Sequence, residues 1–92
     1  MFAASKARED TVKEILLLAE KFINNDVEPK VLTAIKRGYY KIEMSLEELE
    51  NEKVIGPAVA EVLNSLGYDA KYHYREGATH EPLLSVSWEN SN

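Results

Sequence analysis

The sequence contains no cysteine, only three prolines and four glycines, and no long apolar run. The absence of cysteine excludes disulfides, thiolate metal sites and cysteine nucleophiles, and it is compatible with a reducing cytosol. The longest apolar run, Ile15–Ala19, is far too short to cross a bilayer. Residues 1–10 lack the apolar segment of a secretory signal. We therefore expect a soluble, cytoplasmic protein with no membrane partner.

Positive charge is also scarce, since 11 Lys and Arg residues face 16 Asp and Glu residues and the net charge is −5. Nucleic-acid binding draws much of its affinity from basic residues that neutralise phosphates, so we expect no nucleic-acid partner. The hydrophobic content of 45% and the few prolines and glycines indicate a folded chain rather than a disordered one. A chain of 92 residues is typical of one domain, here residues 1–92.

Three extended segments alternate apolar and polar residues with a shared parity. The segments are Tyr39–Leu46, Tyr68–Arg75 and Leu83–Glu89. Because side chains alternate between the two faces of a strand, each segment has one apolar and one polar face. The pattern predicts a one-layer sheet with helices packed on a single face. Apart from Tyr39 and Leu83, the apolar residues are even-numbered: Tyr40, Ile42, Met44, Leu46, Tyr68, Ala70, Tyr72, Tyr74, Leu84, Val86 and Trp88.

Apolar residues at helical spacing predict three helices, over Ser5–Asn24, Val27–Arg37 and Val54–Leu66. Residues 24–26, Asn-Asn-Asp, predict a turn between the first two helices, because these residues favour caps and turns. The predicted inner stripes are Val12, Ile15, Leu16, Ala19, Phe22 and Ile23 in the first helix, Val27, Val31, Leu32 and Ile35 in the second, and Ile55, Val59, Val62, Leu63 and Leu66 in the third.

The predicted element order, α-α-β-α-β-β, is typical of an α+β fold with a three-stranded sheet. A strand–helix–strand crossover makes its two strands parallel, and a hairpin makes the third antiparallel. The last strand then lies between the first two, in the order 1-3-2, with 1-2-3 as the alternative. Leu83 beside Leu84 favours the central position, because both faces of that strand carry an apolar residue. A core this small gives marginal stability, so we also expect a homo-oligomer.

The sequence carries no catalytic motif. Ser85 and Ser87 would neighbour His73 across the sheet, but an open sheet face supplies neither a nucleophile elbow nor a pair of oxyanion donors. The glycines are isolated and form no phosphate-binding loop. We expect no enzymatic activity, no catalytic residues, no cofactor and no metal site.

Three surfaces are candidates for binding. The polar side of the sheet displays donors that suit an anion, and it predicts either a solvated or self-associating surface or an oligomeric binder of an anionic small molecule or nucleotide signal. Its candidate residues are Tyr39, Lys41, Lys71, His73 and Arg75. The segment Glu43–Glu52 holds five glutamates and no basic residue, and it predicts either a solvated connection or an acidic lobe that binds a partner. Separately, two leucines of the first helix lie outside its apolar stripe and favour contact with another protein. The candidate residues for a protein–protein interface are Leu17, Leu18, Glu47, Glu48 and Glu50.

Four short motifs carry a resemblance. They are Val31-x-x-Ala34-Ile35-x-x-Gly38, the alternating strand Tyr39–Ser45, Val62-Leu63-x-x-Leu66-Gly67-Tyr68, and Val86-Ser87-Trp88. With these motifs the chain resembles small uncharacterised proteins of bacteriophages and prophages of Gram-positive bacteria. The resemblance covers residues 31–88, carries over no functional residue, and implies a phage setting. In that setting small acidic proteins serve as virion accessories or block host factors and defence systems. With the absence of a catalytic motif, we expect a non-enzymatic accessory protein in the host cytoplasm that contacts a bacterial host or phage protein.

Overall fold

The computed structural model describes residues 3–74 and 81–89. The elements follow the predicted order α-α-β-α-β-β and confirm the α+β fold. Arg75 and residues 77–80, in the connection between the last two predicted strands, lie outside the described residues. The elements are α1 (Ala4–Phe22), a π-helical turn η1 (Ile23–Val27), α2 (Glu28–Lys36), β1 (Lys41–Ser45), α3 (Glu52–Ser65), β2 (Asp69–Tyr74) and β3 (Pro82–Ser87).

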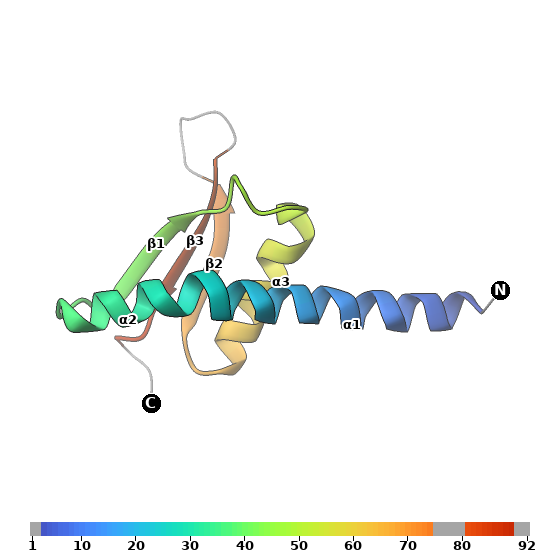
Figure 1. Ribbon diagram of the computed structural model, residues 1–92, viewed down its shortest axis with the longest axis horizontal. Coiled ribbons are helices and arrows are strands. Elements are labelled where there is room, and N and C mark those ends of the chain that lie inside the picture. The colour runs from blue at the N-terminus through green and yellow to red at the C-terminus, as the bar shows by residue number, and fades with distance from the viewer. Residues whose placement is uncertain (1–2, 75–80, 90–92) are drawn as a thin grey trace.

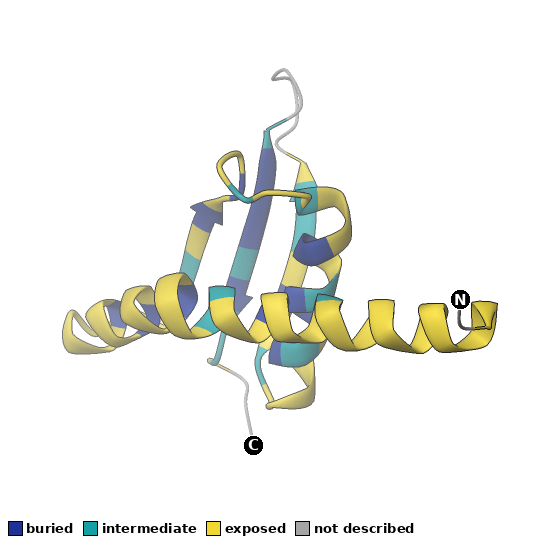
Figure 2. Ribbon diagram, turned by 45° about the vertical axis from the view of Figure 1, so that its right-hand side comes forward, coloured by how far each residue is buried: buried dark blue, intermediate teal, exposed yellow. Residues whose placement is uncertain are grey.

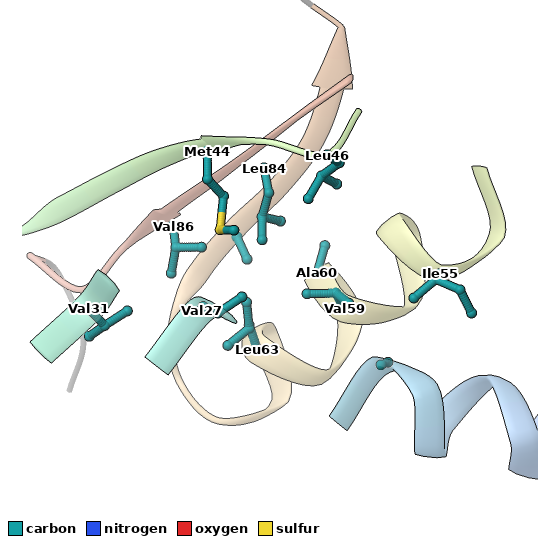
Figure 3. Close-up of a cluster of buried hydrophobic side chains, with 12 residues drawn as sticks. Val27, Val31, Met44, Leu46, Ile55, Val59, Ala60, Leu63, Leu84 and Val86 are labelled. Atoms are coloured by element: carbon teal, nitrogen blue, oxygen red, sulfur yellow. The ribbon is translucent and has the colours of Figure 1, made fainter. Parts of the chain in front are cut away.

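The sheet has the predicted strand order, β1-β3-β2, with β3 antiparallel to both neighbours. The register aligns residues of equal parity, so that Leu84 lies between Met44 on β1 and Tyr72 on β2. Even-numbered side chains therefore share one face. That face is covered by α3, which packs on β2 and β3, and by α2, which packs on β1. Figure 3 shows the buried side chains between the sheet and the helices.

The core contains most of the predicted apolar residues. Its fully buried large side chains come from η1, α3, β3 and the residue that follows β1: Val27, Leu46, Ile55, Val59, Leu84 and Val86. Tyr68 and Trp88 pack at its edge, with ring centroids 6.3 Å apart. Leu83, on the opposite face of the central strand, is also buried.

Several residues that the sequence places in the core are exposed, and those predictions are wrong. Tyr40 precedes the first paired residue of β1 and is 59% exposed. Tyr74, the last residue of β2, is 39% exposed. The other cases lie where a helix extends beyond the surface that covers it: in the N-terminal half of α1, on the outer side of α2 and at the C-terminal end of α3. They are Val12, Leu16, Leu32, Ile35 and Leu66.

The chain continues as one helix through residues 24–26, and the predicted turn there is wrong (Figure 1). A π turn replaces it, in which the Glu28 N–H donates to the Ile23 carbonyl five residues earlier. The apolar residues Ala19, Ile23, Val27 and Val31 are spaced by four. On a straight α-helix each such step rotates by about 40°, and three steps by about 120°. The wider π turn rotates the stripe back, so that Val27 and Val31 join the core.

The first part of α1 extends past the rest of the molecule. Every residue from Ala4 to Glu14, here called the helical arm, is exposed (Figure 2). The radius of gyration is 14.7 Å, whereas a compact chain of this length has about 12 Å. A helix this short is marginal by itself in water, so the arm depends on its continuity with the packed part of α1.

Asn64, in the last turn of α3, binds the edge strand β2 through both ends of its amide. Its Nδ2 donates to the Ala70 carbonyl over 3.0 Å, and its Oδ1 accepts from the Ala70 N–H over 2.7 Å. The side chain thus occupies backbone groups that point away from β3, and it fixes where β2 begins beside α3.

Tyr72 fastens β2 to the start of α3. Its hydroxyl donates to a carboxylate oxygen of Glu52 and lies 3.0 Å from the Tyr74 hydroxyl. The two rings pack edge to face with centroids 5.7 Å apart. Burial raises the pKa of the Tyr72 phenol far above its usual range, and the hydrogen bonds to Glu52 and Tyr74 raise that pKa further.

The raised pKa of Tyr72 predicts a loss of stability at alkaline pH. The folded state holds this proton more tightly than the unfolded state, whose tyrosine pKa is about 10. The contribution is therefore complete below about pH 10 and falls as the pH rises above it. In urea titrations, we expect the wild type to lose stability above about pH 10 more steeply than Tyr72→Phe. Tyr40→Phe, at an exposed tyrosine, is the control and should follow the wild type; equal slopes for all three proteins would contradict the prediction.

Candidate functional site

The polar face of the sheet carries charges of both signs in an alternating arrangement. One row across the strands is Lys41, Ser87 and Asp69, and the next is Glu43, Ser85 and Lys71. Lys41 and Lys71 thus lie on one diagonal of the patch formed by these two rows, and Glu43 and Asp69 lie on the other. These residues line a shallow hollow of about 400 Å³. Within this hollow the two positive and two negative charges balance, so each lysine has a carboxylate beside it.

The structure gathers only part of the predicted anion site. Lys41 and Lys71 line the hollow on the polar face, and His73 is bound beside it. Tyr39 lies with Arg37 in a separate hollow between α2 and β1, which Lys41 also lines. Arg75 lies outside the described residues.

A chain of hydrogen bonds crosses the three strands on this face. His73 Nε2 lies 2.8 Å from the Ser85 hydroxyl, and that hydroxyl donates to Glu43 over 3.4 Å. In a nucleophilic triad, the carboxylate orients the imidazole and the imidazole activates the serine. Here the carboxylate contacts the serine instead. The arrangement ties the strands together and does not order these groups for nucleophilic attack.

Together α1, η1 and α2 form one long helix, Ala4–Lys36. A second hollow, here called the helix groove, lies between this long helix and the connection from β1 to α3. Its volume is about 400 Å³. Leu18, Phe22, Leu49 and Ile55 form its apolar floor, and its polar rim consists of Lys21, Asn25, Asp26, Glu50 and Asn51. The groove therefore combines an apolar interior with a few polar groups, as binding sites in proteins generally do.

The backbone places the groove residues for identifiable reasons. Leu18, Lys21, Phe22 and Asn25 are spaced by i, i+3, i+4 and i+7, which brings them to one side of the helix. Asn51 has φ 58° and ψ 42°, a left-handed conformation that turns the chain from the acidic segment into α3. Among the residues that the structure describes, it is the only one other than glycine with a positive φ.

The groove joins the two surfaces that the sequence proposed as a protein interface. Leu18 and Glu50, far apart in the chain, line the same hollow. Leu17 is 60% exposed and does not line it. Glu47 and Glu48 line a different hollow beside Lys30.

Sequence reasoning missed the rest of the groove. The signal was present in the spacing of Leu18, Lys21, Phe22 and Asn25, which defines a second helix face beside the core stripe. It was hidden because the predicted turn at residues 24–26 interrupted that face. Nothing in the sequence around Asn51 predicts its left-handed backbone conformation, because that conformation depends on the direction in which α3 starts.

Within residues 3–74 and 81–89, no group of three or more His, Asp or Glu side chains could hold a metal ion. No helix in that part of the chain is both long and apolar enough to span a membrane.

Comparisons with protein-family models, with curated proteins and with solved structures found no match to this chain.

Proposed function

We propose that this chain is a non-enzymatic protein-binding domain that takes a segment of a partner polypeptide into the helix groove. One observation carries the proposal: Leu18, part of the apolar floor of the groove, is 44% exposed, although it belongs to a helix that packs on the body of the protein. Protein interfaces commonly have an apolar centre inside a polar rim. The helix groove has that composition on a solvent-accessible surface.

Val12 and Leu16 continue the core stripe of α1 beyond the part that α3 covers, and both are exposed. Leu16 is two residues from Leu18 and so lies on nearly the opposite side of the helix, which makes this exposed stripe a surface separate from the groove. Burial of the apolar floor of the groove by a partner segment would stabilise a complex by about 25 cal/mol per Å² of apolar area, before the cost of association.

The anion-binding alternative has less support. The Lys41 and Lys71 ammonium groups share the polar face with Glu43 and Asp69, so the field of each lysine is offset by a carboxylate. An anionic ligand there would meet as many negative charges as positive ones.

Self-association is a separate part of the proposal. Leu32 and Ile35 are exposed on α2 and do not line the groove. We propose that a second copy covers them, which would leave the groove open for another protein. Size-exclusion chromatography with light scattering should then show an oligomer that Leu32→Glu dissociates; a monomer in the wild type would contradict this part.

The binding proposal predicts different effects for two adjacent leucines. Leu18→Glu places a charge over the apolar floor, whereas Leu17→Glu places the same charge on an exposed side chain outside the groove. The full chain, immobilised and exposed to a bacterial lysate, should retain a specific partner that Leu18→Glu loses by tenfold or more, a change of about 1.4 kcal/mol. Quantitative mass spectrometry of the retained proteins measures the ratio.

Leu17→Glu is the matched control and should retain the partner. Circular dichroism and thermal unfolding should show both variants folded, because both positions are exposed. Equal retention by Leu18→Glu and the wild type would contradict the proposal, and so would the absence of any protein retained by the wild type over a blank support.

A further inference from the structure

Core packing does not require the extra residue that the π turn beside the groove accommodates. If Asn25 were deleted, Val27 and Val31 would follow Ile23 at three and seven residues. The stripe that starts at Ala19 would then have the four-three-four spacing of a straight amphipathic α-helix. An uninterrupted α-helix could therefore bury the same side chains. π turns are rare, cost regular hydrogen bonding, and occur frequently at functional sites.

The π turn and the left-handed Asn51 meet at the same place. Asn25 and Asp26 of the turn line the helix groove from one side, and Asn51 lines it from the side of α3. Two departures from regular backbone geometry thus shape one hollow with an apolar floor. At about 400 Å³, the hollow is within the range of ligand pockets, so an apolar side chain fits with room for its neighbours.

The rim of the groove is acidic. Asp26 and Glu50 contribute two negative charges and Lys21 one positive charge, which leaves a net charge of −1. Glu50 also belongs to the segment Glu43–Glu52, which has no basic residue. A basic group next to the bound side chain would meet complementary charge, and an acidic group would meet repulsion.

The following inference rests on the proposed function. We propose that the helix groove selects a partner segment in which an apolar side chain is adjacent to a lysine or arginine. The apolar side chain contacts Leu18, Phe22 and Ile55, and the basic group lies between Asp26 and Glu50. The partner is a different protein, because this chain has a net charge of −5 and a second copy would bring like charge to the acidic rim.

A displayed library of random peptides tests this specificity without knowledge of the natural partner. The library is selected on the full wild-type chain, and peptides that still bind Leu18→Glu are discarded. We expect the remaining peptides to share an apolar residue next to a lysine or arginine. On the double variant Asp26→Lys/Glu50→Lys, the same selection should yield an apolar residue next to aspartate or glutamate.

Deletion of Asn25 tests the role of the π turn. We expect this variant to unfold cooperatively with a midpoint close to that of the wild type, and to bind the selected peptides at least tenfold more weakly. If the variant does not fold, the claim that packing can dispense with the extra residue is wrong. The selection on the charge-reversed variant then still decides the specificity.

The other outcomes separate the two proposals. Peptides that require Leu18 but carry acidic or neutral neighbours would overturn the inferred specificity and leave the protein-binding function standing. Unchanged peptide preference after charge reversal would overturn the inference as well. If no selected peptide required Leu18, both proposals would fail. A homodimer that Leu18→Glu dissociates would show that a second copy occupies the groove, and it would overturn the choice of a different protein as partner.

Discussion

Replacing Leu63 with alanine is expected to lower the free energy of unfolding by about 3 kcal/mol, whereas Leu66→Ala changes it by less than about 0.5 kcal/mol. The two leucines are one helical turn apart near the C-terminal end of α3. Leu63 is 2% exposed in the core cluster (Figure 3), and Leu66 is 66% exposed. Truncation at Leu63 removes buried contacts and leaves a cavity, and truncation at Leu66 removes only exposed surface.

Urea titration measures both changes, and thermal unfolding should show a fall of roughly 15 °C for Leu63→Ala. Since a domain of this size is marginally stable, that variant should be partly unfolded at moderate temperature. Leu66→Ala is the matched control because it deletes the same atoms from the same helix. Comparable losses of stability for the two variants would contradict the structure. They would indicate that Leu66 is buried, as the apolar stripe in the sequence predicts.

Gly56→Ala is expected to destabilise the protein by about 2 kcal/mol, although alanine in a helix interior normally stabilises by about 1 kcal/mol over glycine. A Cβ atom at position 56 would lie 2.6 Å from Cε1 and 2.7 Å from Cδ1 of Tyr72. The Tyr72 ring cannot move away easily, because its hydroxyl is bonded to Glu52 and its face packs against Tyr74. The absence of a side chain at Gly56 is what lets β2 approach α3 so closely.

A double-mutant comparison isolates this contact. In the Tyr72→Leu background the ring is gone, so Gly56→Ala should become neutral or stabilising by up to about 1 kcal/mol. The change of sign distinguishes steric conflict with the ring from a general intolerance of α3. If Gly56→Ala were equally destabilising in both backgrounds, the close approach of Tyr72 would not be the cause.

The fold was predictable because the alternation of the strands is simple and consistent. The even parity of Ile42, Ala70 and Val86 places them on one buried face, as the register confirms. The neighbouring residues Leu83 and Leu84, which give β3 an apolar side chain on each face, correctly indicate the central strand. These features depend on the period of two along a strand, which the sequence displays directly.

The long helix was harder to predict for two physical reasons. Asn and Asp residues at positions 24–26 favour a turn locally, but burial of Val27 and Val31 favours continuation with a corrected phase. Apolar spacing also says nothing about where the supporting surface ends, so the exposure of Val12 and Leu16 depends on the limited reach of α3.

The candidate site depends on tertiary placement that no local pattern contains. The sequence identified Leu18 and Glu50 separately, but only the packing of α1 beside the start of α3 brings them to one groove. On the polar face, the donors Lys41 and Lys71 were identified without the acidic corners Glu43 and Asp69, because their arrangement requires the register across three strands.

The order β1-β3-β2 has a consequence for synthesis on the ribosome. The strand that joins the other two is the last of the three to be made, so β1 and β2 have no hydrogen-bonded neighbour until Pro82–Ser87 has left the exit tunnel. Up to that point the nascent chain can form its helices, which need only local contacts. The sheet, and the core beneath it, can then close only in one late step.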